Sequence, residues 1–414
     1  VLDWIQNHYS PFVTKHPKYT KKVLKAVLPR KSQNNFTEFV IDQGNKFENK
    51  VIELLCKRFG TDYVLSIGGE LNAHSSEKVQ ETLDAMNKGI PFIHGGLLHN
   101  PENQTYGIPD LLVRSDWLNH LVTIKHLPKI ETTLSAPRLR NRFGKPPKYH
   151  YRVVDIKFTT LSLRSDGTHL LNAKAFPAYK SQLWIYNEAL ARVQGYKPSE
   201  TYILGRRWRF TSKGDIYSGE SCFDRLGVIN YITVDNEYPS KTRKAIQWIK
   251  EVRREEAQEW NLLQVPLERE ELYPNMSNHH DYPWRGVKKA LANATGEITS
   301  LWMVGVKHRK RAHASNVYKW TDPRCTIEVL GVNGEFTKNI LQKMIDINRP
   351  RKRRRIQKID PLYITNNLGD WKNPKKIEFY VDFETVNDVL TDFSDMPYVK
   401  TTSLIFMIGV GYIN

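Results

Sequence analysis

The sequence predicts an α/β fold for the first half of the chain, and three observations predict it. Two short apolar runs, Leu111–Val113 and Tyr151–Val154, have the length and composition of buried strands. Segments with apolar residues at helical spacing, 44–59 and 179–194, precede the first run and follow the second. Helices and strands that alternate along a chain are typical of α/β proteins.

The tripeptide Asp155-Ile156-Lys157 ends the second run and is the most informative feature of the chain. Residues two apart on a strand point to the same face, so we expect the carboxylate and the ammonium to lie side by side. Burying both groups is costly unless a function uses them, for example the binding of a divalent metal ion and a phosphate. The same pattern at Asp370-Trp371-Lys372 is expected to lie in a loop.

Further polar residues lie on the neighbouring elements. Asp110 follows a proline and opens the first strand. Gln182 and Tyr186 are four residues apart and therefore share one face of the later helix. Glu48 lies near the start of the earlier helix, where the helix dipole favours an acid. Each has an ordinary explanation alone, such as a turn residue for Asp110, but their occurrence together in this order favours one shared site.

The order of these motifs resembles the PD-(D/E)XK nuclease superfamily, in its RecB-like branch, over about residues 36–208. Leu112-Val113-Arg114 and Gly205-Arg206-Arg207-Trp208 are similar to the sequence that flanks the motifs in that family. The resemblance implies a restriction-endonuclease-like fold, with a central mixed sheet flanked by helices. It also implies hydrolysis of phosphodiester bonds that depends on Mg²⁺ or Mn²⁺.

The resemblance assigns the metal to the two strands. Asp110 and Asp155 would hold it through carboxylate oxygens, helped by the backbone carbonyl of Ile156. Lys157 would orient the attacking water and offset the charge that develops on the phosphate.

The two helices would complete this site. Glu48 would complete the acidic cluster, but many relatives carry a histidine where this chain has Phe47-Glu48, so Glu53 is the alternative ligand. Gln182 and Tyr186 would position the Asp-x-Lys strand and the nucleic-acid backbone.

The expected function is a nuclease that acts on DNA, with exonucleolytic end processing in repair or recombination favoured over internal nicking. RNA is the alternative substrate, and a nucleic-acid-binding scaffold that does not cleave is the alternative from a different class. The presence of Asp110, Asp155 and Lys157 argues against the scaffold. The expected protein partner is a helicase or another replication or repair factor.

The charge of the chain favours a polyanionic partner. Its 414 residues include 62 Lys and Arg against 44 Asp and Glu, a formal net charge of +18, which favours contact with phosphates. Basic and aromatic residues interleave in several segments, as in surfaces that follow a backbone and stack bases. The segment 138–148 is predicted to be a loop, which either reaches toward DNA or is a disordered insertion. The expected nucleic-acid-binding residues are Arg114, Arg140, Arg142, Lys145, Lys148, Arg206 and Arg207.

Cysteine usage and hydropathy exclude other classes. Cys56, Cys222 and Cys325 are few and far apart, which argues against a disulfide framework, a zinc ribbon and an iron–sulfur cluster. No run approaches the roughly 20 apolar residues that span a bilayer, and no secretory signal opens the chain. We expect an intracellular protein, cytoplasmic or nuclear, that makes no use of a membrane. Because the chain starts at Val1, we expect further residues before it.

We expect five segments along the chain. Residues 1–35 form a basic helical arm and residues 36–236 form the nuclease domain. Residues 237–348 form a helical spacer, in which 298–311 resembles a helix-hairpin-helix. Residues 349–376 form a basic linker that is expected to be exposed, and either binds phosphates or acts as a nuclear-import signal.

Residues 377–414 carry a second resemblance. Phe379–Thr385 is an apolar strand with Asp382 and Glu384 on one face, and 403–412 is a second apolar strand. The pair resembles the opening hairpin of an RNase H-like exonuclease domain of the DEDD type, in which these two acids would bind a metal. The other acids of that family would lie beyond Asn414, so we expect this domain to be incomplete and inactive as given. Plain surface acids are the alternative for Asp382 and Glu384.

Overall fold

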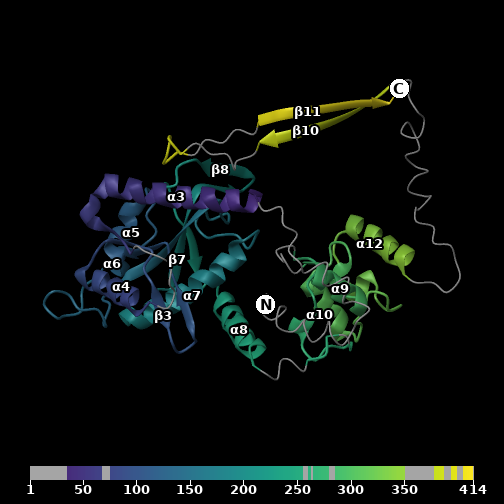
Figure 1. The fold of residues 1–414 in the computed structure, drawn as a ribbon, viewed down its shortest axis with the longest axis horizontal. Coiled ribbons are helices and arrows are strands. Elements are labelled where there is room, and N and C mark those ends of the chain that lie inside the picture. Colours follow the sequence, from purple (N-terminus) through teal and green to yellow (C-terminus); the bar gives the residue numbers. More distant parts are fainter. Residues whose placement is uncertain are drawn as a thin grey trace. The chain divides into compact units, whose positions relative to one another are not determined.

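The computed structural model describes residues 35–67, 75–254, 260–262, 264–278, 285–349, 377–386, 393–398 and 404–413. Two compact units make up the chain (Figure 1), one from residues 34–246 and 379–411 and the other mainly from residues 247–378. The boundary between them follows residue 246 rather than residue 236. Residues 1–34 of the expected arm and 350–376 of the expected linker lie outside the described residues.

The larger unit is an α/β fold around a seven-stranded mixed sheet, so the predicted fold class is confirmed at this level. β1 pairs with β2, and β6 with β7, in parallel; the other neighbours are antiparallel. A separate two-stranded sheet, β3 and β4, packs against α7. The main sheet runs in the order β1 (Val64–Ser66), β2 (Phe92–His94), β5 (Leu111–Arg114), β6 (Tyr151–Ser162), β7 (Glu200–Ser212) and β8 (Asp215–Gly219), with β9 (Gly227–Asn230) also on β7; β3 is Leu98–Asn100 and β4 is Thr105–Gly107.

Helices cover both faces of the sheet. Alternation along the strands sends Leu112 and Val153 into one core and Leu111 and Val154 into the other. The first core packs under α4 and α7, and the second under α3 and α5. The helices of this unit are α3 (Asn35–Phe59), α4 (Ser76–Lys88), α5 (Ser115–Leu121), α6 (Lys129–Thr132) and α7 (Phe176–Gln194), with the 3₁₀ turn η1 (Thr61–Tyr63).

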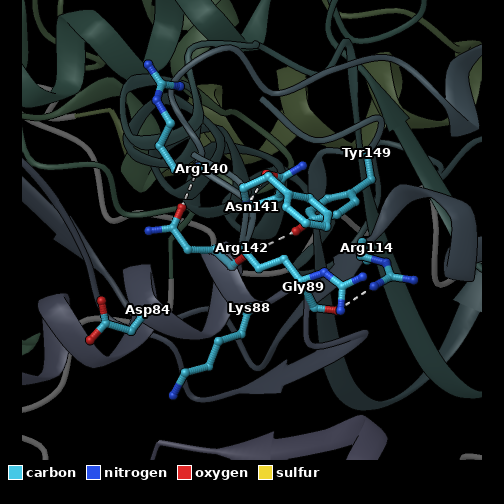
Figure 2. A pocket seen from close by; sticks show the side chains of 10 residues that line it. Asp84, Lys88, Gly89, Arg114, Arg140, Asn141, Arg142 and Tyr149 are labelled. Atoms are coloured by element: carbon cyan, nitrogen blue, oxygen red, sulfur yellow. Dashed lines mark hydrogen bonds between the residues drawn. The ribbon is translucent and has the colours of Figure 1, made fainter. Parts of the chain in front are cut away.

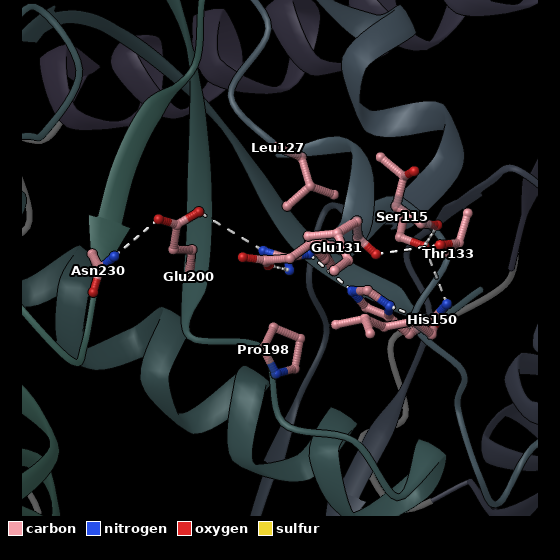
Figure 3. Close-up of polar contacts among 12 residues, drawn as sticks. Ser115, Leu127, Glu131, Thr133, His150, Pro198, Glu200 and Asn230 are labelled. Atoms are coloured by element: carbon pink, nitrogen blue, oxygen red, sulfur yellow. Dashed lines mark hydrogen bonds and ion pairs between the residues drawn. The ribbon is translucent and has the colours of Figure 1, made fainter. Parts of the chain in front are cut away.

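A buried polar network ties the start of β6 to the start of β7 (Figure 3). Arg152 is fully buried, and its guanidinium donates to Nε2 of His150 at 3.0 Å and to the hydroxyl of Tyr202 at 2.9 Å. It also pairs with Glu131, and Tyr202 donates to Glu200 at 2.8 Å. The buried charge is therefore paired and hydrogen-bonded on several sides, as a buried charge requires.

The smaller unit is mostly helical in its described residues. The helix expected near Ile298 is only the 3₁₀ turn η4 (Ile298–Ser300). Arg309 on the following helix is buried and pairs with Glu297 at 3.1 Å, so it does not face a phosphate backbone. The described elements are α8 (Tyr238–Val252), which crosses the unit boundary, η3 (Glu270–Leu272), α9 (Arg285–Thr295), α10 (Val306–Ala314), α11 (Ile327–Leu330) and α12 (Glu335–Asn348).

The two strands expected near the end of the sequence are present as β10 (Glu378–Val386) and β11 (Leu404–Ile413), which form a sheet of their own. In the segment of chain that joins β10 to β11, Met396 is buried in the core under α3. The ring of Phe393, in the same segment, lies 6.4 Å from that of Phe47. None of the described helices combines the length and the apolar character needed to cross a membrane.

Candidate active site

The start of β5 brings Asp110 to β6. The antiparallel register pairs Leu111 with Val154, so Asp110 lies opposite Asp155. Oδ2 of Asp110 accepts a hydrogen bond of 2.7 Å from the backbone amide of Ile156. Pro109 precedes this acid and favours the extended backbone that leads into the strand. Two aspartates distant in the sequence therefore become neighbours through the strand register.

Asp155 and Lys157 lie on the same face of β6. Nζ of Lys157 lies 2.6 Å from Oδ2 of Asp155 and 3.4 Å from Oδ2 of Asp110. The Asp155 residue is 1% exposed, and neither of its carboxylate oxygens accepts a well-directed hydrogen bond from the described residues. The contact with Lys157 is thus an ion pair that leaves most of the Asp155 lone pairs available, an unusual state for a buried carboxylate.

The electrostatics of the cluster follow from burial and like charge. Burial, together with repulsion from Asp155, holds the pKa of Asp110 well above its usual range, and Glu48 adds to this effect. Burial alone would lower the pKa of Lys157, but the carboxylates of Asp155 and Asp110 raise it above its usual value. Lys157 is therefore a permanent cation, and the two aspartates form a site that a further cation would stabilise.

Helix α7 contributes two tyrosines and a glutamine beside the cluster of Asp110, Asp155 and Lys157. Nε2 of Gln182 donates to the hydroxyl of Tyr186 at 2.7 Å, and Nζ of Lys157 lies 5.7 Å from the centroid of the Tyr179 ring. Burial first, and then the charge of Asp155, raise the pKa of Tyr186 to about 12. The Tyr186 hydroxyl therefore keeps its proton at neutral pH. Because it accepts from Gln182, it can donate that proton to another oxygen.

Gly107 makes room for Tyr186. A Cβ at position 107 would overlap the Tyr186 ring. The segment Gly107-Ile108-Pro109-Asp110 therefore serves two purposes, since its glycine seats the tyrosine and its aspartate enters the acidic cluster. No sequence pattern shows this contact, because it joins β4 to a helix far along the chain.

Glu48 lies on α3 and is held by a histidine. Its Oε1 lies 2.9 Å from Nε2 of His94, whose Nδ1 lies 3.0 Å from the hydroxyl of Ser66. Glu48 acts on the Asp110 carboxylate through its charge. Glu53, the alternative ligand, faces solvent and pairs with Lys50 at 2.8 Å, so it does not belong to the cluster. The sequence gives no signal for His94 beyond its place at the end of a short strand.

The donor set fits a hard divalent cation. The Asp110 and Asp155 carboxylates and the Ile156 carbonyl supply oxygen atoms, the ligands that Mg²⁺ and Mn²⁺ prefer. The buried, poorly satisfied oxygens of Asp155 agree with this chemistry. Across the described ranges, no group of three or more His, Cys, Asp or Glu side chains is arranged to hold a metal ion. The protein ligands would therefore be few, as is usual for Mg²⁺, which keeps several waters.

The residues expected to bind nucleic acid fall into two groups. Arg140, Arg142, Lys145 and Lys148 are exposed on the segment 138–148, which is a loop as expected. The prediction that Arg206 binds nucleic acid is corrected. Arg206 is 7% exposed, and its guanidinium packs 4.5 Å from the centroid of the Phe158 ring.

Two other arginines of that set are already engaged. Nε of Arg207 donates to Thr160 at 2.9 Å, across the pair of strands β6 and β7. Arg114 pairs with Asp116 at 2.7 Å at the start of α5. Each of these arginines supports the local structure.

The second expected site is the pair Asp382 and Glu384. Both acids are exposed on β10, with Tyr380, Val381 and Phe383 exposed beside them. The described residues supply no third acid to this pair that would make a metal site.

Comparison with known proteins adds no assignment. No family model matches the chain. No curated protein matches its sequence.

Proposed function

We propose that the larger unit is a metal-dependent nuclease of restriction-endonuclease-like fold that hydrolyses DNA phosphodiester bonds. One observation carries the proposal: Asp110, Asp155 and Lys157 come from two separate strands, and Lys157 Nζ lies within 3.4 Å of both carboxylates. A buried cluster with two acids and one lysine is costly to build. Phosphodiester hydrolysis uses such a cluster, with the acids on a metal ion and the cation near the reacting phosphate.

The two aspartates and the Ile156 carbonyl would hold Mg²⁺ or Mn²⁺. A bound ion of this kind polarises a phosphoryl oxygen and makes a water more acidic. The hydrogen bond from the Ile156 amide fixes one oxygen of Asp110. Neither oxygen of Asp155 accepts a well-directed hydrogen bond from the described residues, and Oδ2 is held only by the ion pair with Lys157, which supports a role for this carboxylate as a metal ligand.

Side chains of the protein would position the water and the phosphate around the metal ion. Lys157, a permanent cation, would orient the attacking water and stabilise the negative charge that grows on the phosphate. Tyr186, which keeps its proton, would donate a hydrogen bond to a phosphate oxygen, and Gln182 would hold that hydroxyl in place. Glu48, fixed by His94, would keep the site acidic from the side of α3.

DNA is the proposed substrate, and processing from an end is the proposed mode. The net charge of +18 supports a polyanionic substrate. For the C-terminal strands we propose the opening hairpin of an RNase H-like domain, supported only by the placing of Asp382 and Glu384 two residues apart on β10.

The test is digestion of end-labelled DNA and RNA of matched sequence with Mg²⁺, with Mn²⁺ and with EDTA. The proposal predicts metal-dependent loss of DNA, released from the end as short products. Preferential digestion of RNA would show that RNA, and not DNA, is the substrate. Binding of nucleic acid without cleavage in either metal would refute the nuclease proposal and support a nucleic-acid-binding scaffold.

A further inference from the structure

A pocket lies at the opposite end of β5 from the acidic cluster (Figure 2). Its volume is about 550 Å³, within the range of small-molecule sites. The last turn of α4, the end of β5 and the loop 140–143 line it. A strand rises about 3.3 Å per residue, so Arg114 in this pocket lies on the order of 13 Å along β5 from Asp110. The pocket is therefore distinct from the candidate active site.

The lining of the pocket is basic. Lys88, Arg140 and Arg142 are exposed there, and no carboxylate of the described residues pairs with any of them. The guanidinium of Arg140 donates to carbonyls of its own loop, those of Pro137 and Leu139, and the backbone amide of Arg140 donates to Oδ1 of Asn87 at 2.8 Å. Figure 2 shows these side chains with the one acid of the described lining, Asp84, which accepts a hydrogen bond of 2.8 Å from Gln80. Three cations are thus left for a ligand.

The C-terminal end of α4 would ordinarily repel an anion, because its carbonyls carry partial negative charge. Here fixed donors cover that end. The Tyr149 hydroxyl donates to the Met86 carbonyl at 3.1 Å, and the guanidinium of Arg114 donates to the carbonyl of Gly89. These donors satisfy two carbonyls at this end, which reduces the repulsion that an anion in the pocket would meet.

An aromatic ring completes the pocket. Phe143 is 68% exposed, and the Arg142 guanidinium lies 4.6 Å from the centroid of its ring. The ring is presented on an ordered turn, since Oδ1 of Asn141 accepts hydrogen bonds from the amides of Phe143 at 2.9 Å and Lys145 at 3.1 Å. An exposed planar ring beside several unpaired cations is the arrangement that stacks a base and holds its phosphate.

We propose that this pocket binds one nucleotide unit of a single-stranded nucleic acid, with the base on Phe143 and the phosphate between Arg140, Arg142 and Lys88. The proposal rests on the proposed nuclease function for the identity of the strand, which would be the substrate held away from the cleavage centre. A free nucleoside monophosphate has the same chemistry and is the second source to test.

Binding of a fluorescein-labelled oligothymidylate, followed by anisotropy in EDTA, tests the pocket without cleavage. Phe143→Ala is expected to weaken binding about ten-fold, the usual loss for one stacked base. The matched control is Phe336→Ala, which removes a 72% exposed phenylalanine outside the pocket and should leave the affinity unchanged. Arg142→Gln is expected to reduce the slope of log affinity against log salt by about 0.7. Its control, Lys125→Gln at an exposed lysine outside the pocket, should leave the slope unchanged.

The outcomes separate the pocket from the proposed catalysis. If thymidine 5′-monophosphate binds as tightly as the oligonucleotide, and Phe143→Ala weakens both, the ligand is the free nucleotide; much tighter binding of the oligonucleotide identifies a strand. Unchanged affinity in both Phe143→Ala and Arg142→Gln overturns the pocket proposal, even where the wild type digests DNA. A wild type that never cleaves, with binding that depends on Phe143, refutes the nuclease and keeps the pocket.

Discussion

The backbone amide of Ile156 donates a hydrogen bond of 2.7 Å to Oδ2 of Asp110. This bond joins the start of β5 to β6 in the middle of the acidic cluster, and it holds one carboxylate beside the ion pair of Asp155 and Lys157. Like charges held together in a buried place cost stability, and such local costs are concentrated at functional sites.

Asp110→Asn tests that cost. We expect the free energy of unfolding in EDTA at pH 7 to rise by about 1 kcal/mol, because the amide oxygen still accepts from Ile156 while repulsion from Asp155 disappears. The pKa of Asp110 is raised in the folded protein, so its ionised form destabilises the fold above that pKa. The gain should therefore vanish at low pH, where the wild-type acid is protonated. Urea denaturation at both pH values measures it, and a less stable variant at pH 7 would contradict the explanation.

Gly107→Ala tests the close packing of the Tyr186 ring against residue 107. The added methyl group overlaps the ring, so we expect a loss of about 1–3 kcal/mol in the free energy of unfolding. We also expect reduced cleavage as the tyrosine is displaced. Gly44→Ala is the matched control, because a Cβ there meets nothing within 4 Å and the residue lies inside α3. That control should gain up to about 1 kcal/mol. Equal effects of the two substitutions would argue against the role of Gly107.

His150→Gln tests the buried network around Arg152. His150 accepts from Arg152 through Nε2 and faces the Leu134 carbonyl through Nδ1, so only the neutral ring fits both contacts. Burial, and then the charge of Arg152, lower the pKa of His150 to about 4. The unfolded state binds the proton more readily, so stability falls as the pH drops below the usual histidine value, by a total of about 3 kcal/mol once the pH is well below 4.

The measurement is the free energy of unfolding between pH 7 and pH 4, compared with His120→Gln at an exposed histidine of α5. We expect the His150 variant to lose less stability over this range than the wild type, and the His120 variant to follow the wild type. His126, whose pKa burial also lowers to about 4, should leave a residual dependence. A wild type with the same stability at both pH values would contradict this explanation.

Local patterns predict the elements that carry the site. The apolar runs indicate β5 and β6, and the helical spacing indicates α7, because burial imposes these periods on the sequence. The period of two predicts the contact between Asp155 and Lys157, which lies at 2.6 Å. α3 begins at Asn35 rather than at Gly44, since a glycine with open space around it does not stop a helix that packs through other residues.

Long-range packing decides what local patterns cannot. His94 reaches Glu48 only because β2 pairs with β5, which sets His94 opposite Leu111. Arg206 looks like a surface cation in a basic run, but β7 pairs with β6, and Arg206 packs against Phe158 of that strand in the interior. Both outcomes depend on which strands become neighbours, and no window of sequence contains that information.

Cleavage by Asp155→Asn tests the central claim most directly. The side chain keeps its size, and the binding of DNA in EDTA provides evidence that the protein remains folded. With Mg²⁺ and end-labelled DNA, we predict that the wild type and the exposed-site control Asp62→Asn digest the substrate, while Asp155→Asn binds it and loses at least about a hundred-fold in rate. Digestion by Asp155→Asn at the wild-type rate would show that the cluster of Asp110, Asp155 and Lys157 is not the cleavage centre.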